Sequence, residues 1–124
     1  MDKCYCGSEN TFVNCCKPFL EKTKFPEAPE QLMRSRYTAY VLHNADYLIQ
    51  TTHVFQRNNY SKQDVLDWAK ENTWDKLEVL QAFENIVEFK AHYINVENEE
   101  QVHHEKSTFK LELGIWYYVD GVYY

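Results

Sequence analysis

Four cysteines lie within the first sixteen residues of this 124-residue chain, and the rest of the sequence contains none. They form two pairs: one residue separates Cys4 from Cys6, and Cys15 is adjacent to Cys16. Two pairs joined by a loop can place four sulfur atoms at the corners of a tetrahedron, the arrangement that zinc prefers. The residues between the pairs suffice for a tight turn at Gly7 and about one helical turn. The pattern therefore predicts a closed zinc site with all four cysteines as ligands.

Three other uses of four cysteines stay open: disulfides, an iron–sulfur cluster and a redox-active dithiol. Disulfides fit less well because the amino terminus, Met-Asp-Lys-Cys, has no apolar segment for export to an oxidising compartment. The spacing is also tighter than in the usual ferredoxin motifs, and a Cys-x-Cys pair alone is a weak redox signal. We therefore expect a cytoplasmic protein with a structural zinc ion. A site closed by four thiolates leaves the ion no catalytic role.

Composition narrows the remaining function classes. The net charge of −6 argues against nonspecific nucleic-acid binding, because phosphate contacts need clustered lysine and arginine. No segment approaches the roughly 20 apolar residues of a membrane-spanning helix, so no membrane role is expected. Aromatic residues make up 16% of the chain and include ten tyrosines, which suit a cavity wall as well as a core.

The first part of the chain shows helical periods. A helix is expected from about Pro29, where apolar residues recur at helical spacing. Asn44 and Ser61 are expected to cap two further helices over about 44–52 and 61–72.

From Trp74 onward apolar and polar residues alternate with a period of two. Gly114 predicts a hairpin turn, and Asp120-Gly121 predicts a second tight turn near the end. Helices followed by antiparallel strands predict an α+β domain with the helices on one face of a sheet. The strands are expected over about 77–81, 87–94, 103–113 and 116–119.

Two groups of residues resemble known proteins. The segment Cys4-Tyr5-Cys6-Gly7-Ser8, with Cys15-Cys16-Lys17-Pro18-Phe19-Leu20, resembles the SEC-C zinc motif, named for the tail of the bacterial preprotein translocase ATPase. The run from Ala28 to Leu48 and the ending from His104 to Gly121 are similar to the central domain of YchJ-like proteins. Since these segments occur in the family's order over nearly the whole chain, the sequence resembles the YchJ-like family.

The resemblance implies a fold and a division of the chain. The family's central domain is NTF2-like, so we expect helices packed in a strongly curved antiparallel sheet that forms a cone. A zinc knuckle is expected in residues 1–20, a linker in 21–29 and the NTF2-like domain in 30–124. Glu9 and Lys17 stand where members often carry glycine, so the turn geometry is expected to differ slightly. The second, C-terminal SEC-C motif of many relatives is expected to be missing, because none precedes Tyr124.

The resemblance also implies a function for the zinc knuckle. SEC-C motifs of the translocase tail are implicated in contacts with a chaperone and with ribosomes, so a protein partner is expected, with Tyr5 and Phe12 on the contact surface. The alternative is that both aromatic rings pack against the larger domain and the knuckle is only a zinc staple. We favour a non-enzymatic zinc-binding accessory protein. A homodimer through the exposed sheet face is a further expectation, with these tyrosines as candidates: Tyr117, Tyr118, Tyr123 and Tyr124.

The cone itself would offer a pocket for a small ligand. An enzyme of the isomerase, dehydratase or hydrolase type is the alternative function, although fold resemblance does not transfer chemistry. The candidate pocket residues are Arg34, Tyr37, Tyr40, Asp46, His53, His104 and Trp116.

Spacing limits how these candidates can combine. Asp46 and His53 are two helical turns apart, about 10 Å, so they are not expected to share a proton. Arg34 and Arg36 point about 200° apart on one helix, so only one can face the cavity, and a carboxylate such as Glu30 is the expected partner of the other.

Overall fold

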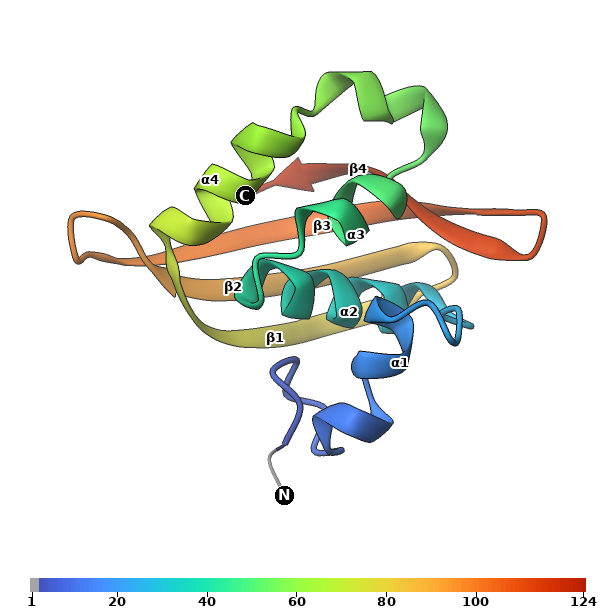
Figure 1. Ribbon diagram of the computed structural model, residues 1–124, viewed down its shortest axis with the longest axis horizontal. Coiled ribbons are helices and arrows are strands. Elements are labelled where there is room, and N and C mark those ends of the chain that lie inside the picture. Colours follow the sequence, from blue (N-terminus) through green and yellow to red (C-terminus); the bar gives the residue numbers. More distant parts are fainter. Residues whose placement is uncertain (1–2) are drawn as a thin grey trace.

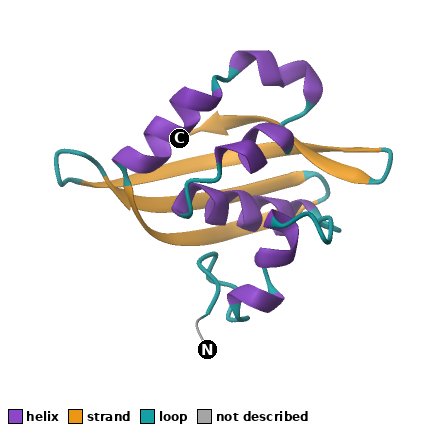
Figure 2. Ribbon diagram, in the orientation of Figure 1, coloured by secondary structure: helices purple, strands orange, loops and turns teal. Residues whose placement is uncertain are grey.

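The computed structural model describes residues 3–124 and confirms the α+β class, with helices first and strands after them (Figures 1 and 2). The helical elements are η1 (Phe12–Asn14), α1 (Lys17–Leu20), α2 (Pro29–Val41), α3 (Ala45–Gln50), η2 (Val54–Asn59) and α4 (Lys62–Glu71). The strands are β1 (Thr73–Phe83), β2 (Ile86–Ile94), β3 (Glu100–Glu112) and β4 (Ile115–Tyr123).

The predicted helix starts are confirmed by their caps. Asn44 Oδ1 accepts a hydrogen bond from the backbone N–H of Tyr47 at 3.0 Å, and Ser61 Oγ accepts one from that of Asp64 at 3.3 Å. Each bond satisfies an amide that has no partner inside its helix. The short elements α1 and η2 were not predicted, because so few residues show no helical period.

The four strands form one antiparallel sheet in the order β1-β2-β3-β4, so each strand pairs with its neighbour in sequence. A two-residue turn joins β3 to β4: Leu113 has φ 52° and Gly114 has φ 81°. Positive φ at both positions is the turn geometry that matches the twist of two paired strands. The hairpin predicted at Gly114 is therefore confirmed.

The sheet is twisted but not strongly curled, so the expected cone-like curvature is not confirmed (Figure 1). The irregularities in strand pairing lie between β1 and β2 and between β3 and β4, while the central β2–β3 pair is regular. Bulges bend a sheet locally, and this open sheet of four strands does not close on itself.

α2 and α3 lie over one face of the sheet, and α2 packs against β1, β2 and β4 (Figure 1). The core between these layers contains fully buried Leu32, Leu48, Val87 and Phe109. Within residues 3–124, no helix has both the length and the apolar character needed to cross a membrane.

The tight turn predicted at Asp120-Gly121 is wrong, because β4 continues through both residues. Asp120 pairs with Thr108 and Gly121 with Ser107 on the neighbouring strand. A Cβ atom at Gly121 would lie 2.1 Å from Glu105 Oε2. Glycine is needed here for the close approach of a side chain and not for a turn.

The C-terminal tyrosines do not form one exposed patch. Tyr118 is buried, and its ring contacts Phe109 on the helix side of the sheet. Tyr124 is exposed, and its ring lies 4.7 Å from that of His104. Alternation along the strands divides these side chains between the two faces. The dimer expected from them stays untested.

Candidate functional site

The four cysteine side chains converge into one cluster, with every pair of Sγ atoms within 4.8 Å. Cys6 Sγ lies 3.6 Å from Cys15 Sγ, and Cys15 Sγ lies 3.9 Å from Cys16 Sγ. A tetrahedron with zinc–sulfur bonds of about 2.3 Å has sulfur atoms about 3.8 Å apart. These separations fit a tetrathiolate metal site and are far longer than a disulfide bond.

Backbone geometry in the loop between the pairs aims the thiols inward. Gly7 has φ 80° and Glu9 has φ 74°, so the chain turns twice through the left-handed region within three residues. The backbone N–H of Cys4 donates to the carbonyl of Asn10 at 2.7 Å, and that of Gly7 donates to the carbonyl of Cys4 at 3.2 Å. The tight turn expected at Gly7 is therefore present.

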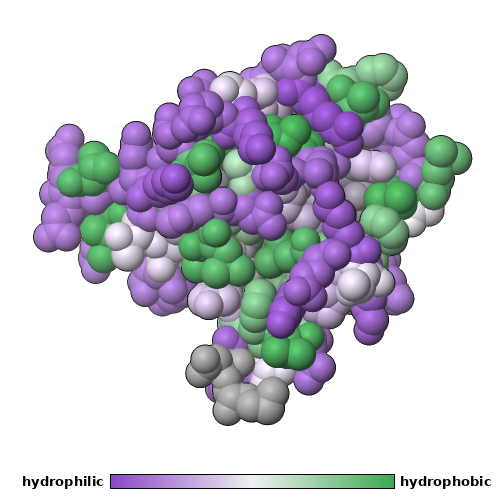
Figure 3. Space-filling model, in the orientation of Figure 1, coloured by the Kyte–Doolittle hydropathy of each residue, from purple (hydrophilic) through white to green (hydrophobic). Residues whose placement is uncertain are grey.

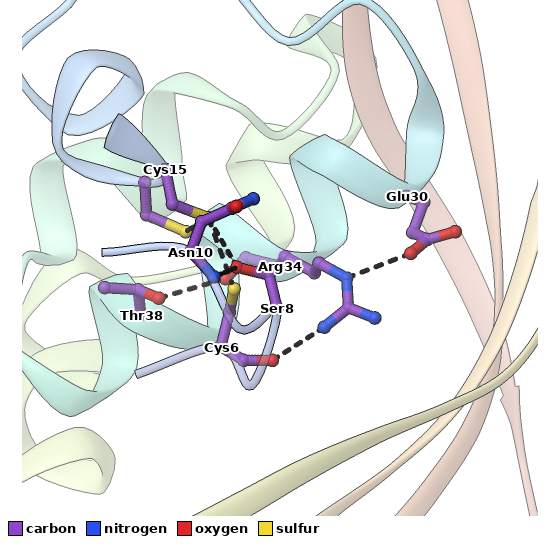
Figure 4. Close-up of polar contacts among 8 residues, drawn as sticks. Cys6, Ser8, Asn10, Cys15, Glu30, Arg34 and Thr38 are labelled. Atoms are coloured by element: carbon purple, nitrogen blue, oxygen red, sulfur yellow. Dashed lines mark hydrogen bonds and ion pairs between the residues drawn. The ribbon is translucent and has the colours of Figure 1, made fainter. Parts of the chain in front are cut away.

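The cysteine segment is docked against α2 and is not a separate body. Arg34 Nη1 donates to the carbonyl oxygen of Cys6 at 2.7 Å, while its Nε donates to Glu30 Oε2 at 2.9 Å (Figure 4). Ser8 Oγ lies 3.0 Å from Cys15 Sγ beside the cluster (Figure 4). The cluster therefore joins the same core as the sheet, with three buried cysteines: Cys4, Cys6 and Cys16.

The neighbouring thiols of Cys6, Cys15 and Cys16 differ in pKa. The hydrogen bond from Cys16 lowers the pKa of Cys6 to about 4, and the same contact, together with burial, raises the pKa of Cys16. Burial raises the pKa of Cys15 to about 11. One thiolate is thus favoured, near the Arg34 guanidinium. A metal that binds all four sulfurs would displace the remaining protons.

The two aromatic residues of the knuckle have different surroundings. Tyr5 is 48% exposed, whereas Phe12 is half-buried and packs against the core. Their rings meet edge to face, with centroids 5.4 Å apart. Phe12 is thus a packing residue, and Tyr5 remains on the surface.

A cavity of about 240 Å³ lies between the helices and the sheet. Most of its wall is aromatic, and Trp74 contacts several of the other rings: its centroid lies 5.4 Å from that of Tyr40 and 5.1 Å from that of Trp68. The polar side chains on its wall include Arg36, His103 and Glu105.

Glu105 is 5% exposed and accepts three hydrogen bonds at the cavity. His103 Nε2 lies 2.7 Å from Oε1, and Ser107 Oγ and Tyr118 Oη donate to Oε2 at 2.6 and 2.8 Å. Burial alone would raise the pKa of Glu105, but these three hydrogen bonds lower it below its ordinary value. Glu105 is therefore a buried carboxylate.

Of the seven predicted pocket residues, Tyr37 and Tyr40 line this cavity. The other five lie elsewhere in the described chain. Asp46 pairs with Lys62 at 2.7 Å, His53 with Glu112, and His104 with Glu88 at 2.7 Å. Two candidates contact the N-terminal part of the chain: Arg34 bonds Cys6, and Trp116 Nε1 donates to the carbonyl of Glu27 at 3.3 Å.

The predicted set missed His103 and selected its neighbour His104, which faces away from the cavity. Strand alternation carried the necessary signal, because residues two apart share a face and Phe109 is a large apolar residue of the same strand. Counting back from Phe109 through Ser107 and Glu105 reaches His103. The predicted set also missed Arg36, which is 8% exposed and lines the cavity. Arg34 faces the knuckle instead, in keeping with the expected 200° separation of the two side chains.

Comparison with protein families gives a match that covers most of the chain. The model described as "YchJ, middle NTF2-like domain" matches residues 28–121. A UPF0225 protein from Actinobacillus succinogenes is 41% identical over 124 residues, which cover 95% of this chain and 80% of the relative. A UPF0225 protein from Haemophilus influenzae is 40% identical over 125 residues, with 97% and 77% covered.

Solved structures of SEC-C motif containing proteins share the fold. The solution structure of one from Rhodopseudomonas palustris is 38% identical, with a TM-score of 0.91 and 96% of each chain covered. The crystal structure of another, from Psychrobacter arcticus, is 26% identical, with a TM-score of 0.79 and coverage of 94% of this chain and 80% of that one.

Proposed function

Since the chain belongs to the YchJ-like family, whose curated members are named UPF0225 proteins, we propose that it is a zinc-binding accessory protein. Zinc is held by Cys4, Cys6, Cys15 and Cys16 and fastens the amino-terminal segment to α2. The observation that carries this proposal is the convergence of four thiols at separations that suit a tetrahedral ion. The ion is structural, because the four sulfurs leave it no open position.

Metal analysis tests the zinc site. Untagged protein purified without added metal should contain one zinc ion per chain, and cobalt in its place should show the visible spectrum of tetrahedral thiolate coordination. Cys15→Ser and Cys16→Ser should lose the ion. Thr38→Val is the matched control: it removes a hydroxyl 4.0 Å from Cys4 Sγ, leaves all four thiols and should keep the zinc. Metal-free wild type, or iron in place of zinc, would contradict the proposal.

The accessory function places a protein partner on the exposed side of the knuckle. Tyr5 and Val13, 48% and 53% exposed, offer apolar surface beside the metal site, next to Lys3. On the helix-covered face, hydrophobic side chains form small separate groups among hydrophilic ones (Figure 3). A compact contact centred on the knuckle is therefore a better fit than a broad apolar interface.

A pull-down comparison tests the partner surface. Tyr5→Ala combined with Val13→Ala should remove the specific partners that wild type retains, because these substitutions remove apolar surface from the knuckle while all four cysteines stay in place. Phe55→Ala is the control, since Phe55 is 82% exposed on η2, at the other end of the molecule (Figure 1). Identical partner sets for all three proteins would refute recognition by the knuckle and leave the zinc staple.

A further inference from the structure

The aromatic cavity holds polar groups that the zinc site does not use. His103, Glu105 and Arg36 line it together with rings from α2, α4, β1 and β2, and it lies apart from the cysteine cluster. A cavity that is mostly apolar, with a few fixed polar groups, is the usual form of a small-molecule site.

The charges of this cavity are already balanced within the protein. The Arg36 guanidinium lies 4.4 Å from the centroid of the Tyr118 ring, and the hydroxyl of that tyrosine donates to Glu105. Arg36 Nη1 also donates to the carbonyl of Leu48 at 2.9 Å and to Thr51 Oγ1 at 2.7 Å. One cation and one anion are therefore joined through Tyr118, so with a neutral His103 ring these groups leave no net charge to attract an ionic ligand.

Within residues 3–124, one nitrogen of the His103 ring has no hydrogen-bond partner from the protein. Glu105 is ionised and can only accept, so the hydrogen between it and His103 resides on Nε2. In the neutral ring, Nδ1 then carries a lone pair. Among residues 3–124, no protein group bonds this Nδ1 atom, and His103 forms part of the cavity wall.

We propose that this cavity binds a small neutral aromatic molecule whose hydroxyl group donates a hydrogen bond to His103 Nδ1. The rings of Tyr40, Trp68 and Trp74 would contact the flat apolar face of the ligand. Glu105 is a positioning residue, because it fixes the tautomer and orientation of His103 without contacting the hydroxyl. None of the four cysteines lines this cavity.

Phenol and toluene test the proposal, because they differ only by hydroxyl against methyl. Binding to the full zinc-loaded chain is measured by calorimetry. Phenol should bind, and His103→Phe should weaken it about fivefold, the effect of one net hydrogen bond, while the affinity for toluene stays within twofold. His104→Phe is the matched control on the opposite face and should change neither affinity. Benzoate and benzylamine, which are charged, should bind more weakly than phenol.

A spectroscopic measurement on wild type covers the case in which His103→Phe fails to fold. In nitrogen-15 spectra recorded at a pH where the His103 ring is neutral, its hydrogen should reside on Nε2, and phenol should shift the Nδ1 resonance but not that of His104. In Glu105→Gln the other tautomer should become populated. The proposal is overturned if phenol does not bind, if His103 carries its hydrogen on Nδ1, or if the two His→Phe variants bind phenol equally.

Discussion

At the scale of single residues, Glu9 combines an unfavourable backbone conformation with a position beside the cysteine cluster. Its φ of 74° lies in the left-handed region of backbone conformation, which residues other than glycine rarely adopt. Its carboxylate pairs with Lys3 at 2.7 Å, but both side chains are highly exposed, so that pair stabilises little. Glu9 thus holds a backbone conformation that suits glycine better than a residue with a side chain.

Replacement of Glu9 should show this strain. Glu9→Gly relieves the left-handed conformation and should raise the free energy of unfolding of the zinc-loaded protein by about 0.5 kcal/mol, since greater freedom in the unfolded state offsets part of the gain. Glu9→Ala removes the same ion pair but keeps the strain, and should not stabilise. Chemical denaturation of both variants checks the difference, and a stabilised alanine variant would contradict it.

Glu105 predicts a specific dependence of stability on pH. Hydrogen bonds lower the pKa of Glu105 in the folded protein. Its contribution to the free energy of unfolding is therefore fully present above pH 4.5, the ordinary pKa, and is lost as the pH falls through the lower pKa of the folded state. Glu105→Gln should cost about 2 kcal/mol at pH 7. The difference in the free energy of unfolding between wild type and this variant should stay constant down to about pH 4.5 and narrow below it. Denaturation curves over this range check the effect, and a gap that narrows above pH 5 would contradict it.

At the scale of elements, α2 serves two sites from opposite sides. Arg34 reaches the carbonyl of Cys6 in the knuckle, whereas Arg36, Tyr37 and Tyr40 line the cavity. Two arginines separated by one residue can do this only because a helix turns by about 100° per residue. The helix therefore links the position of the cysteine segment to the shape of the cavity wall.

Arg34 should anchor the knuckle through its hydrogen bond and not through its ion pair. Arg34→Ala removes the bond to Cys6 and leaves a buried carbonyl without that donor, so the free energy of unfolding should fall by about 1–2 kcal/mol. Glu30→Gln removes only the charge of the exposed partner and should cost under about 0.5 kcal/mol. Thermal denaturation of the two zinc-loaded variants compares them, and equal losses would show that the ion pair, not the carbonyl contact, is the anchor.

Gly121, in the β3–β4 pair, has no room for a Cβ atom. Gly121→Ala would place a Cβ 2.1 Å from Glu105 Oε2, so the carboxylate must move and its three hydrogen bonds must change. We expect a loss of about 2 kcal/mol or more, together with weaker protection of Tyr118 from solvent. Gly114→Ala has open space around it and should lose only about 1 kcal/mol, through its φ of 81°. Denaturation and hydrogen exchange distinguish the two, and the reverse order would refute the close-approach role.

At the scale of the whole molecule, the cysteine cluster and the sheet share one core. Buried Cys4, Cys6 and Cys16 belong to the same packed cluster as Leu32 and Phe109. Loss of a metal from such a position removes a constraint from the main domain and not only from the terminal segment.

Removal of the metal should therefore lower the stability of the entire chain. With a strong chelator and a reductant present, the melting temperature followed by circular dichroism should fall by roughly 10 °C in one transition. Cys15→Ser without chelator should have the same melting temperature as chelator-treated wild type. Addition of chelator should not lower the melting temperature of this variant further. An unchanged main transition with loss of only the terminal segment would contradict a shared core.

The sequence by itself determined the features that depend on local spacing: the cysteine set that clusters, the helix caps at Asn44 and Ser61, the hairpin at Gly114 and the family. Caps, turns and short loops need only neighbouring residues, so their signals lie within a few positions.

Only the tertiary structure decided the curvature of the sheet, the use of Gly121 and the members of the cavity wall. Asp120-Gly121 has the local pattern of a turn, but pairing with Thr108 and Ser107 extends the strand, and Glu105 occupies the space beside the glycine. His103 was available from strand parity, yet its pairing with the cavity rings depends on how far α2 and α4 stand from the sheet. Such contacts join residues far apart in sequence, and strand pairing and packing fix them where no local propensity can.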